Sequence, residues 1–199
     1  FILFARNCSS RSQISDLTAS LRDAVGRSEA MILIDQEGGR VARLKAPEFR
    51  AAPPAQVFGR LAAKDLSLAQ EAARLNARLI ASELFSLGIN VDCLPVLDVP
   101  APGGHDIIGD RAFASDPEVV AALGRSTAKG LMAGGVLPIA KHIPGHGRAG
   151  ADSHLALPVV DAPRTELEQI DFLPFRALRD LPLAMTAHVV YSATDAVHP

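Results

Sequence analysis

Two histidines and a lysine gather in the segment KHIPGHG, which starts at Lys141. On a helix, His142 and His146 would share one face and could bind zinc, as in the H-E-x-x-H pattern. Pro144 and Gly145 disfavour a helix, so we predict a loop that follows a β-strand. Lys141 and His142 at the strand end can both donate hydrogen bonds to a polar ligand. The alternative is a structural turn with hydrogen-bonded histidines.

A second histidine motif follows in the stretch ADSH, which contains Asp152 and His154. An aspartate two residues before a histidine can accept a hydrogen bond from the imidazole and fix its tautomer. The carboxylate also raises the histidine pKa, which suits a general acid. His154 is therefore a candidate acid/base with Asp152 as its partner. The alternative is a surface turn in which Asp152 caps the backbone.

Charged side chains in two further stretches are candidate ligands. Asp35 and Arg43 lie in DQEGGRVAR, and Arg111 lies in IGDR. A carboxylate can accept hydrogen bonds from sugar hydroxyls, and an arginine can donate them to oxygen atoms. The alternatives are an ion pair of Asp35 with an arginine that only stabilises the fold, and a solvated loop position for Arg111.

Apolar runs that end in polar clusters alternate with helical patterns along the chain. Ile14, Leu17, Leu21 and Val25 repeat at helical spacing, and Gly26 follows as a stop signal. The predicted strands cover residues 1–5, 30–34, 89–97, 136–140 and 183–190.

Three further helices are predicted from their first residues. A capping box at Ser67, SLAQ, opens a long helix. Asp116 is an N-cap followed by Pro117 at the first helical position. A second capping box at Thr165 opens another helix, which Pro174 breaks in two.

The alternation of strands and helices predicts an α/β fold with a parallel sheet. A doubly wound sheet and a TIM (β/α)8 barrel both fit this pattern. Polar clusters at the carboxyl ends of several different strands favour the barrel, and the G-x-G-x-x-G turn of a doubly wound nucleotide site is absent. A closed barrel needs eight strands, and about five can be counted. We therefore interpret residues 1–199 as a single, incomplete TIM-barrel domain of a longer protein.

The composition narrows the classes of function. The formal net charge is −2, and no run of like charge indicates nucleic-acid binding. No apolar stretch is long enough to span a bilayer. Cys8 and Cys93 lie far apart in no metal-ligand spacing, and no G-x-S-x-G elbow marks a serine hydrolase. We expect neither a nucleic-acid nor a membrane partner.

Taken together, these motifs resemble the family 3 glycoside hydrolases. The closer similarity is to the bacterial β-N-acetylglucosaminidases of that family. The chain departs from the usual family pattern at Ile143, where phenylalanine is common; this apolar exchange changes little. The resemblance rests on blocks that follow the family's order along nearly the whole chain: ILFARN, IDQEGGRVAR, PVLDV, IGDRAF, KHIPGHG, ADSH and AHVVYS.

The resemblance implies a (β/α)8 barrel whose first, seventh and eighth strands are missing from this chain. It makes His154 the acid/base, with Asp152 as its partner. The family nucleophile is an aspartate in a Ser-Asp-Asp-like motif after the seventh strand, so we expect it downstream of Pro199. The residues implied to bind the terminal N-acetylglucosamine are Asp35, Arg43, Arg111, Lys141 and His142.

The implied activity is that of a retaining exo-β-N-acetylglucosaminidase. Its substrates would be small carbohydrates, namely muropeptide fragments in peptidoglycan recycling. The resemblance further implies a monomeric, cytoplasmic enzyme without a metal or other cofactor.

Two alternatives stay open. A metal-dependent barrel hydrolase could use His142, His146, Asp152 and His154, and EDTA would then abolish its activity. A non-catalytic sugar-binding module or fragment would bind N-acetylglucosamine without turnover, since no nucleophile is identified in this chain.

Overall fold

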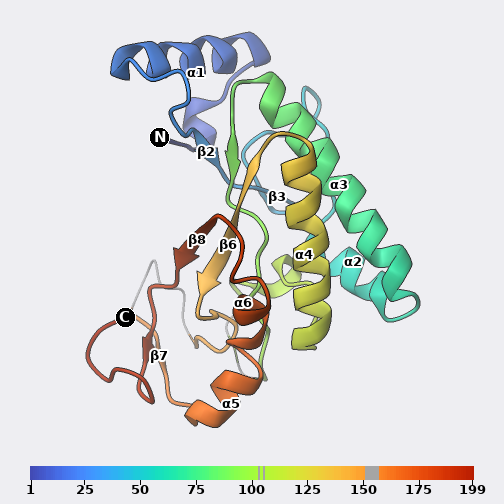
Figure 1. The fold of residues 1–199 in the computed structure, drawn as a ribbon, viewed down its shortest axis with the longest axis vertical. Coiled ribbons are helices and arrows are strands. Elements are labelled where there is room, and N and C mark those ends of the chain that lie inside the picture. The colour runs from blue at the N-terminus through green and yellow to red at the C-terminus, as the bar shows by residue number, and fades with distance from the viewer. Residues whose placement is uncertain (103, 105, 151–156) are drawn as a thin grey trace.

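The computed structural model describes residues 1–102, 104, 106–150 and 157–199. Within them, the central sheet has five parallel strands in the order β1-β2-β5-β6-β8, which is also their order along the chain (Figure 1). Each strand overlaps one of the five predicted apolar runs, so the α/β prediction with a parallel sheet is confirmed. The strands are β1 (Ile2–Leu3), β2 (Leu33–Ile34), β5 (Val91–Asp92), β6 (Leu137–Ile143) and β8 (Leu183–Thr186).

The strand boundaries differ from the prediction, most clearly at β6 and β8. β6 continues to Ile143, so Lys141 and His142 lie in the strand and not only at its end. The run 183–190 is divided, because β8 stops at Thr186 and a separate strand follows. The remaining short strands form an antiparallel pair, β3 (Gln36–Gly38) with β4 (Val41–Ala42), and a parallel pair, β7 (Val159–Val160) with β9 (Val190–Tyr191).

The connections between strands contain most of the helical residues. None of the helices in the described part of the chain has the length and apolar character needed to cross a membrane. The helices are α1 (Arg11–Val25), α2 (Ala55–Ala62), α3 (Leu66–Ser86), α4 (Pro117–Ala133), α5 (Arg164–Gln169) and α6 (Leu173–Ala177), with 3-10 turns η1 (Ala5–Asn7) and η2 (Gly109–Arg111).

The ends of α1 and α4 follow their sequence signals. Gly26 adopts the left-handed conformation, with φ of 64°, and ends α1 as predicted. The side chain of Asp116 accepts hydrogen bonds from the backbone of Glu118 and Val119, and Pro117 starts α4. Pro174 lies at the start of α6, which confirms the predicted break between α5 and α6.

Both predicted capping boxes were wrong. The helix α3 starts at Leu66, and Asp65 is its N-cap because its carboxylate accepts from the backbone N–H of Leu68. Ser67 therefore lies inside the first turn. The helix α5 starts at Arg164 after Pro163, so Thr165 is also already helical. In both cases the helix starts upstream of the hydroxyl side chain, which then has no N-cap position to fill.

The helices α3 and α4 run side by side along one side of the sheet (Figure 1). Their close approach depends on small residues. A Cβ on Gly130 would lie 2.2 Å from the carbonyl oxygen of Arg74, and one on Gly134 would lie 2.4 Å from Ala81 Cβ. Apolar side chains of α3 and α4, such as Leu84 and Leu131, are fully buried in the core beneath. This packing holds the strands so that their carboxyl ends share one edge.

Candidate active site

A cavity of about 590 Å³ lies at the carboxyl ends of the strands. The five sugar ligands that the resemblance implies all line this cavity, although they come from three separate stretches of the chain. The fold therefore brings together the five residues that the resemblance implied, with further polar groups that it did not. The polar residues of the lining are Asp35, Glu37, Arg43, Arg111, Lys141, Thr186 and the histidines His142, His146 and His188; the apolar ones include Phe4, Val41, Ile107, Ile108 and Met185.

Asp35 follows β2 and lies between two cations. Its Oδ1 accepts from Lys141 Nζ at 2.8 Å, and its Oδ2 accepts from Arg43 Nη2 at 2.9 Å. The predicted alternative of an aspartate–arginine ion pair is therefore present, but the pair lies in the cavity wall. Burial opposes ionisation of Asp35, yet Lys141 and Arg43 hold the pKa of this carboxyl below its usual value.

Lys141 is almost completely buried, with 1% of its surface exposed. Its ammonium lies between Asp35 and Glu37, with Nζ 2.6 Å from Glu37 Oε1. Burial alone would lower the pKa of Lys141, but the two carboxylates raise it above its usual value. The ammonium therefore stays charged and keeps one N–H for a ligand.

An irregularity in β6 explains how neighbouring residues reach the same cavity. Successive side chains of a regular strand point to opposite faces. The pairing of β6 with β8 shifts register between Lys141 and Ile143. Such a shift breaks the alternation, and both Lys141 and His142 line the cavity.

Glu37 in β3 is a central group that the sequence prediction did not select. Its carboxylate holds Arg111 in a bidentate pair, with Nε to Oε2 and Nη2 to Oε1 both at 2.8 Å. Burial disfavours its charge, but Arg111 and Lys141 keep the pKa of Glu37 below its usual value. Its position two residues after Asp35 was the available signal, because such residues share a face of a strand.

Asp98 is the second buried carboxylate that the sequence did not assign to the site. It is fully buried, and its Oδ1 accepts from the backbone N–H of His142 at 3.2 Å and of His146 at 2.7 Å. Its Oδ2 lies 2.6 Å from His142 Nδ1. Despite burial, the His142 imidazole and the two backbone donors lower the pKa of Asp98. An ionised carboxylate only accepts, so Nδ1 carries the proton and Nε2 of His142 is left for a ligand.

His146 and the glycines of KHIPGHG organise the segment after β6. The ring centroids of His142 and His146 lie 5.9 Å apart, and burial lowers the pKa of His146. Gly145 has φ of 135°, and a Cβ on Gly147 would lie 1.8 Å from the carbonyl oxygen of Val99. Gly145 therefore allows the turn, and Gly147 allows the backbone to pass close to Val99.

The metal-binding alternative needs four residues, of which two can be placed. In the part of the chain that the structure describes, no group of three histidine, cysteine or carboxylate side chains could hold a metal ion. Asp152 and His154 lie outside the described residues. Their predicted roles as acid/base pair or metal ligands thus stay predictions.

Arg148 lies in the segment after β6 and is held by two carboxylates. Its Nε donates to Asp171 at 2.7 Å, and its Nη1 lies 2.8 Å from Glu166. Asp171 is fully buried, and Tyr191 donates its hydroxyl to the carbonyl oxygen of Gly145. Residues from α5 and β9 thus anchor the segment that follows β6.

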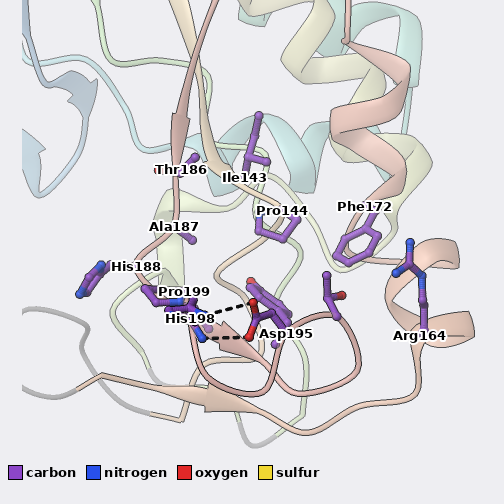
Figure 2. Close-up of a pocket in the computed structure, with 13 residues that line it drawn as sticks. Ile143, Pro144, Arg164, Phe172, Thr186, Ala187, His188, Asp195, His198 and Pro199 are labelled. Carbon is purple, nitrogen blue, oxygen red and sulfur yellow. Dashed lines mark hydrogen bonds and ion pairs between the residues drawn. The ribbon is translucent and has the colours of Figure 1, made fainter.

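A neighbouring cavity of about 460 Å³ is less suited to catalysis (Figure 2). Its carboxylate, Asp195, pairs with His198 through Oδ2 and Nδ1 at 3.2 Å. Much of the remaining wall is apolar, including Ile143, Pro144 and Phe172 (Figure 2). His188 lines both cavities, but none of the five predicted sugar ligands lies in this one.

The comparisons with known proteins agree with this geometry. Residues 1–199 match the Glycosyl hydrolase family 3 N terminal domain. The chain belongs to glycosyl hydrolase family 3. A relative named Beta-hexosaminidase from Nitrosomonas eutropha is 39% identical over 196 residues, which cover 98% of this chain and 56% of that protein. The chain thus spans little more than half of this family member.

Solved structures of family 3 members show the same fold. Native NagZ from Neisseria gonorrhoeae is 40% identical, with a TM-score of 0.92 over 99% of this chain and 57% of that one. A second structure of that protein, in complex with N-trifluoroacetyl-D-glucosamine, is equally similar: 40% identity and a TM-score of 0.92 over 99% and 58% of the two chains. The α/β fold of this chain therefore corresponds to part of the family domain.

Proposed function

We propose that the protein is a β-N-acetylglucosaminidase that removes terminal β-linked N-acetylglucosamine. The observation that carries this proposal is the cavity in which Asp35, Arg43, Arg111, Lys141 and His142 converge. Two facts support it: the relatives are named Beta-hexosaminidase, and a similar structure contains an N-acylated glucosamine.

The polar groups of the cavity divide the recognition of a sugar between them. Asp35 keeps a lone pair on each oxygen beyond those used by Lys141 and Arg43, so it can accept from hydroxyls. The ammonium of Lys141 and the guanidinium of Arg111 donate. His142 contributes Nε2, since Asp98 occupies Nδ1.

The proposed chemistry is retaining hydrolysis with a covalent intermediate. An aspartate encoded after residue 199 attacks the anomeric carbon, and the bond to the leaving oxygen breaks as His154 protonates that oxygen. In the second step His154 takes a proton from water, the resulting hydroxide attacks the anomeric carbon, and the aspartate leaves. Asp152 orients His154 throughout.

The proposal extends to the biological setting. The substrates are muropeptide fragments released during peptidoglycan recycling, and the enzyme works in the cytoplasm as a monomer. It uses a single TIM-barrel domain and needs no cofactor.

The first test uses the protein produced from its complete gene and a chromogenic N-acetyl-β-glucosaminide. Wild-type protein hydrolyses this substrate, and His154→Ala reduces kcat about 10²–10⁴-fold, which is the typical contribution of general acid–base catalysis. A His154→Ala rate within about twofold of wild type contradicts the acid/base assignment. Wild-type protein that binds N-acetylglucosamine without turnover contradicts the proposed activity.

A further inference from the structure

Glu37 lies in the wall of the cavity, where it is in contact with two predicted sugar ligands. Only 4% of its side chain is exposed. Its Oε1 accepts from Lys141 and Arg111, and its Oε2 accepts from Arg111. Both oxygens are thus held by cations, and Oε1 accepts from two of them.

Lys141 and Arg111 each have N–H groups that Glu37 does not accept, and these can donate to a ligand. The Lys141 ammonium has three N–H groups, and the carboxylates of Asp35 and Glu37 accept from two. The Arg111 guanidinium has five, of which Glu37 accepts two and the carbonyl of Ile107 accepts one. Glu37 therefore fixes the direction in which the remaining N–H groups of both cations point.

The charge of Glu37 also allows these two cations to lie close together. Lys141 Nζ and Arg111 Nη2 lie 2.6 and 2.8 Å from the same oxygen, Oε1. Without a negative charge at this point, the like charges repel each other, and Lys141 has little solvent to screen it. The guanidinium would then lose its bidentate partner and the orientation that the pair imposes.

We propose that Glu37 is a positioning residue for sugar binding: it holds the Lys141 ammonium and the Arg111 guanidinium in one arrangement, so that both donate to the same sugar. This inference rests on the proposed function, because it assumes that these two side chains bind the substrate. It assigns to the glutamate of DQEGGR a role through its neighbours and not through contact with the substrate.

The test compares Glu37→Gln with wild type in the protein produced from its complete gene, using the same chromogenic N-acetyl-β-glucosaminide. Glutamine keeps the size of the side chain and removes its charge. We expect KM to rise about tenfold or more, as for the loss of a hydrogen bond to a charged group, and kcat to change less than about threefold. Glu71→Gln, at an exposed ion pair in α3, is the control and leaves both parameters unchanged.

A double-mutant cycle with Arg111→Ala separates positioning from a general structural effect. If Glu37 acts through Arg111, Glu37→Gln raises KM less in the Arg111→Ala background than in wild type. Equal effects in both backgrounds, or an unchanged KM in Glu37→Gln, overturn the inference while the wild-type activity still supports the proposed function. Absence of activity in the wild type overturns both.

Glu37→Asp covers the case in which the glutamine variant does not fold. It keeps the charge and shortens the side chain, so we expect a folded protein whose KM lies between those of wild type and Glu37→Gln. The melting temperature of each variant reports folding. If neither variant folds, the role of Glu37 is structural and the inference is wrong.

Discussion

Two buried carboxylates hold neighbouring residues in different ways: Glu37 contacts Lys141, and Asp98 contacts His142. All hydrogen-bond donors to Glu37 belong to the side chains of cations. Two of the three donors to Asp98 are backbone N–H groups, and the third is the His142 imidazole. Glu37 therefore fixes the positions of charges, whereas Asp98 fixes the path of the backbone from His142 to His146.

The largest loss of stability should come from the replacement of Asp98. Asp98→Ala leaves two buried backbone donors and the His142 imidazole without their acceptor. We expect the free energy of unfolding to fall by about 3–5 kcal/mol, because each donor left without an acceptor in the interior costs about 1–3 kcal/mol. Equilibrium unfolding in urea, with an unchanged m-value, measures this loss.

Asp98→Asn is the matched variant. It separates the contribution of the backbone hydrogen bonds to stability from that of the His142 imidazole. Its Oδ1 can still accept from the two backbone N–H groups, but its amide N–H₂ faces His142 Nδ1, which must then accept. The proton of His142 moves to Nε2. We expect a smaller loss of stability than in Asp98→Ala, with a shifted ¹⁵N spectrum of His142. Equal losses in both variants contradict the assignment of Asp98 to the backbone.

We expect acid to cause a smaller loss of stability than Asp98→Ala does, and this loss tests the role of the Glu37 charge. The folded-state pKa of Glu37 lies below its ordinary value of about 4.3 in unfolded chains. The unfolded state therefore takes up the proton first as the pH falls. The stabilisation is complete above about pH 4.3 and is lost as the pH falls through the lower folded-state pKa. Unfolding curves from pH 6 downward should be less pH-dependent in Glu37→Gln than in wild type.

We expect no loss of activity when metal ions are removed. This experiment tests whether His142, which pairs with Asp98, binds the sugar or a metal ion. The structure pairs His142 Nδ1 with Asp98, and the proposal uses Nε2 for the sugar. Dialysis against EDTA should leave hydrolysis of the N-acetyl-β-glucosaminide unchanged. Activity that disappears with EDTA and returns with zinc would instead support the metal-dependent alternative. It would contradict the role of His142 as a sugar ligand.

The smallest effect is expected at an exposed ion pair that does not line the cavity of the candidate site. Arg164 and Glu168 form an exposed i,i+4 pair on α5 at 2.9 Å. Water screens such pairs, and they contribute little to stability. Arg164→Ala should therefore leave the urea midpoint within experimental error. A clear loss there would show that charge removal destabilises this protein in general, which would weaken any conclusion from Glu37 or Asp98.

The sequence alone determined the local features of this protein. The alternation of apolar runs and helical patterns was enough to place the five strands, because burial on both faces demands continuous apolar runs. Gly26, Asp116 and Pro174 marked helix boundaries correctly, since each acts through its own backbone. At Ser67 and Thr165 the hydroxyl motifs misled, because α3 starts after the Asp65 cap and α5 starts after Pro163, upstream of both residues.

Only the tertiary structure decided which polar groups become partners. Asp35 and Lys141 are 106 residues apart, and Glu37 and Arg111 are 74 apart. Such contacts depend on the order and register of strands, which polar residues at strand ends do not encode by themselves. The sequence therefore indicated that polar groups gather at the strand ends, whereas the fold placed Glu37 in the cavity wall and buried Asp98 beside His142. A buried charge persists only where the assembled structure supplies enough donors, and no local pattern reveals those donors.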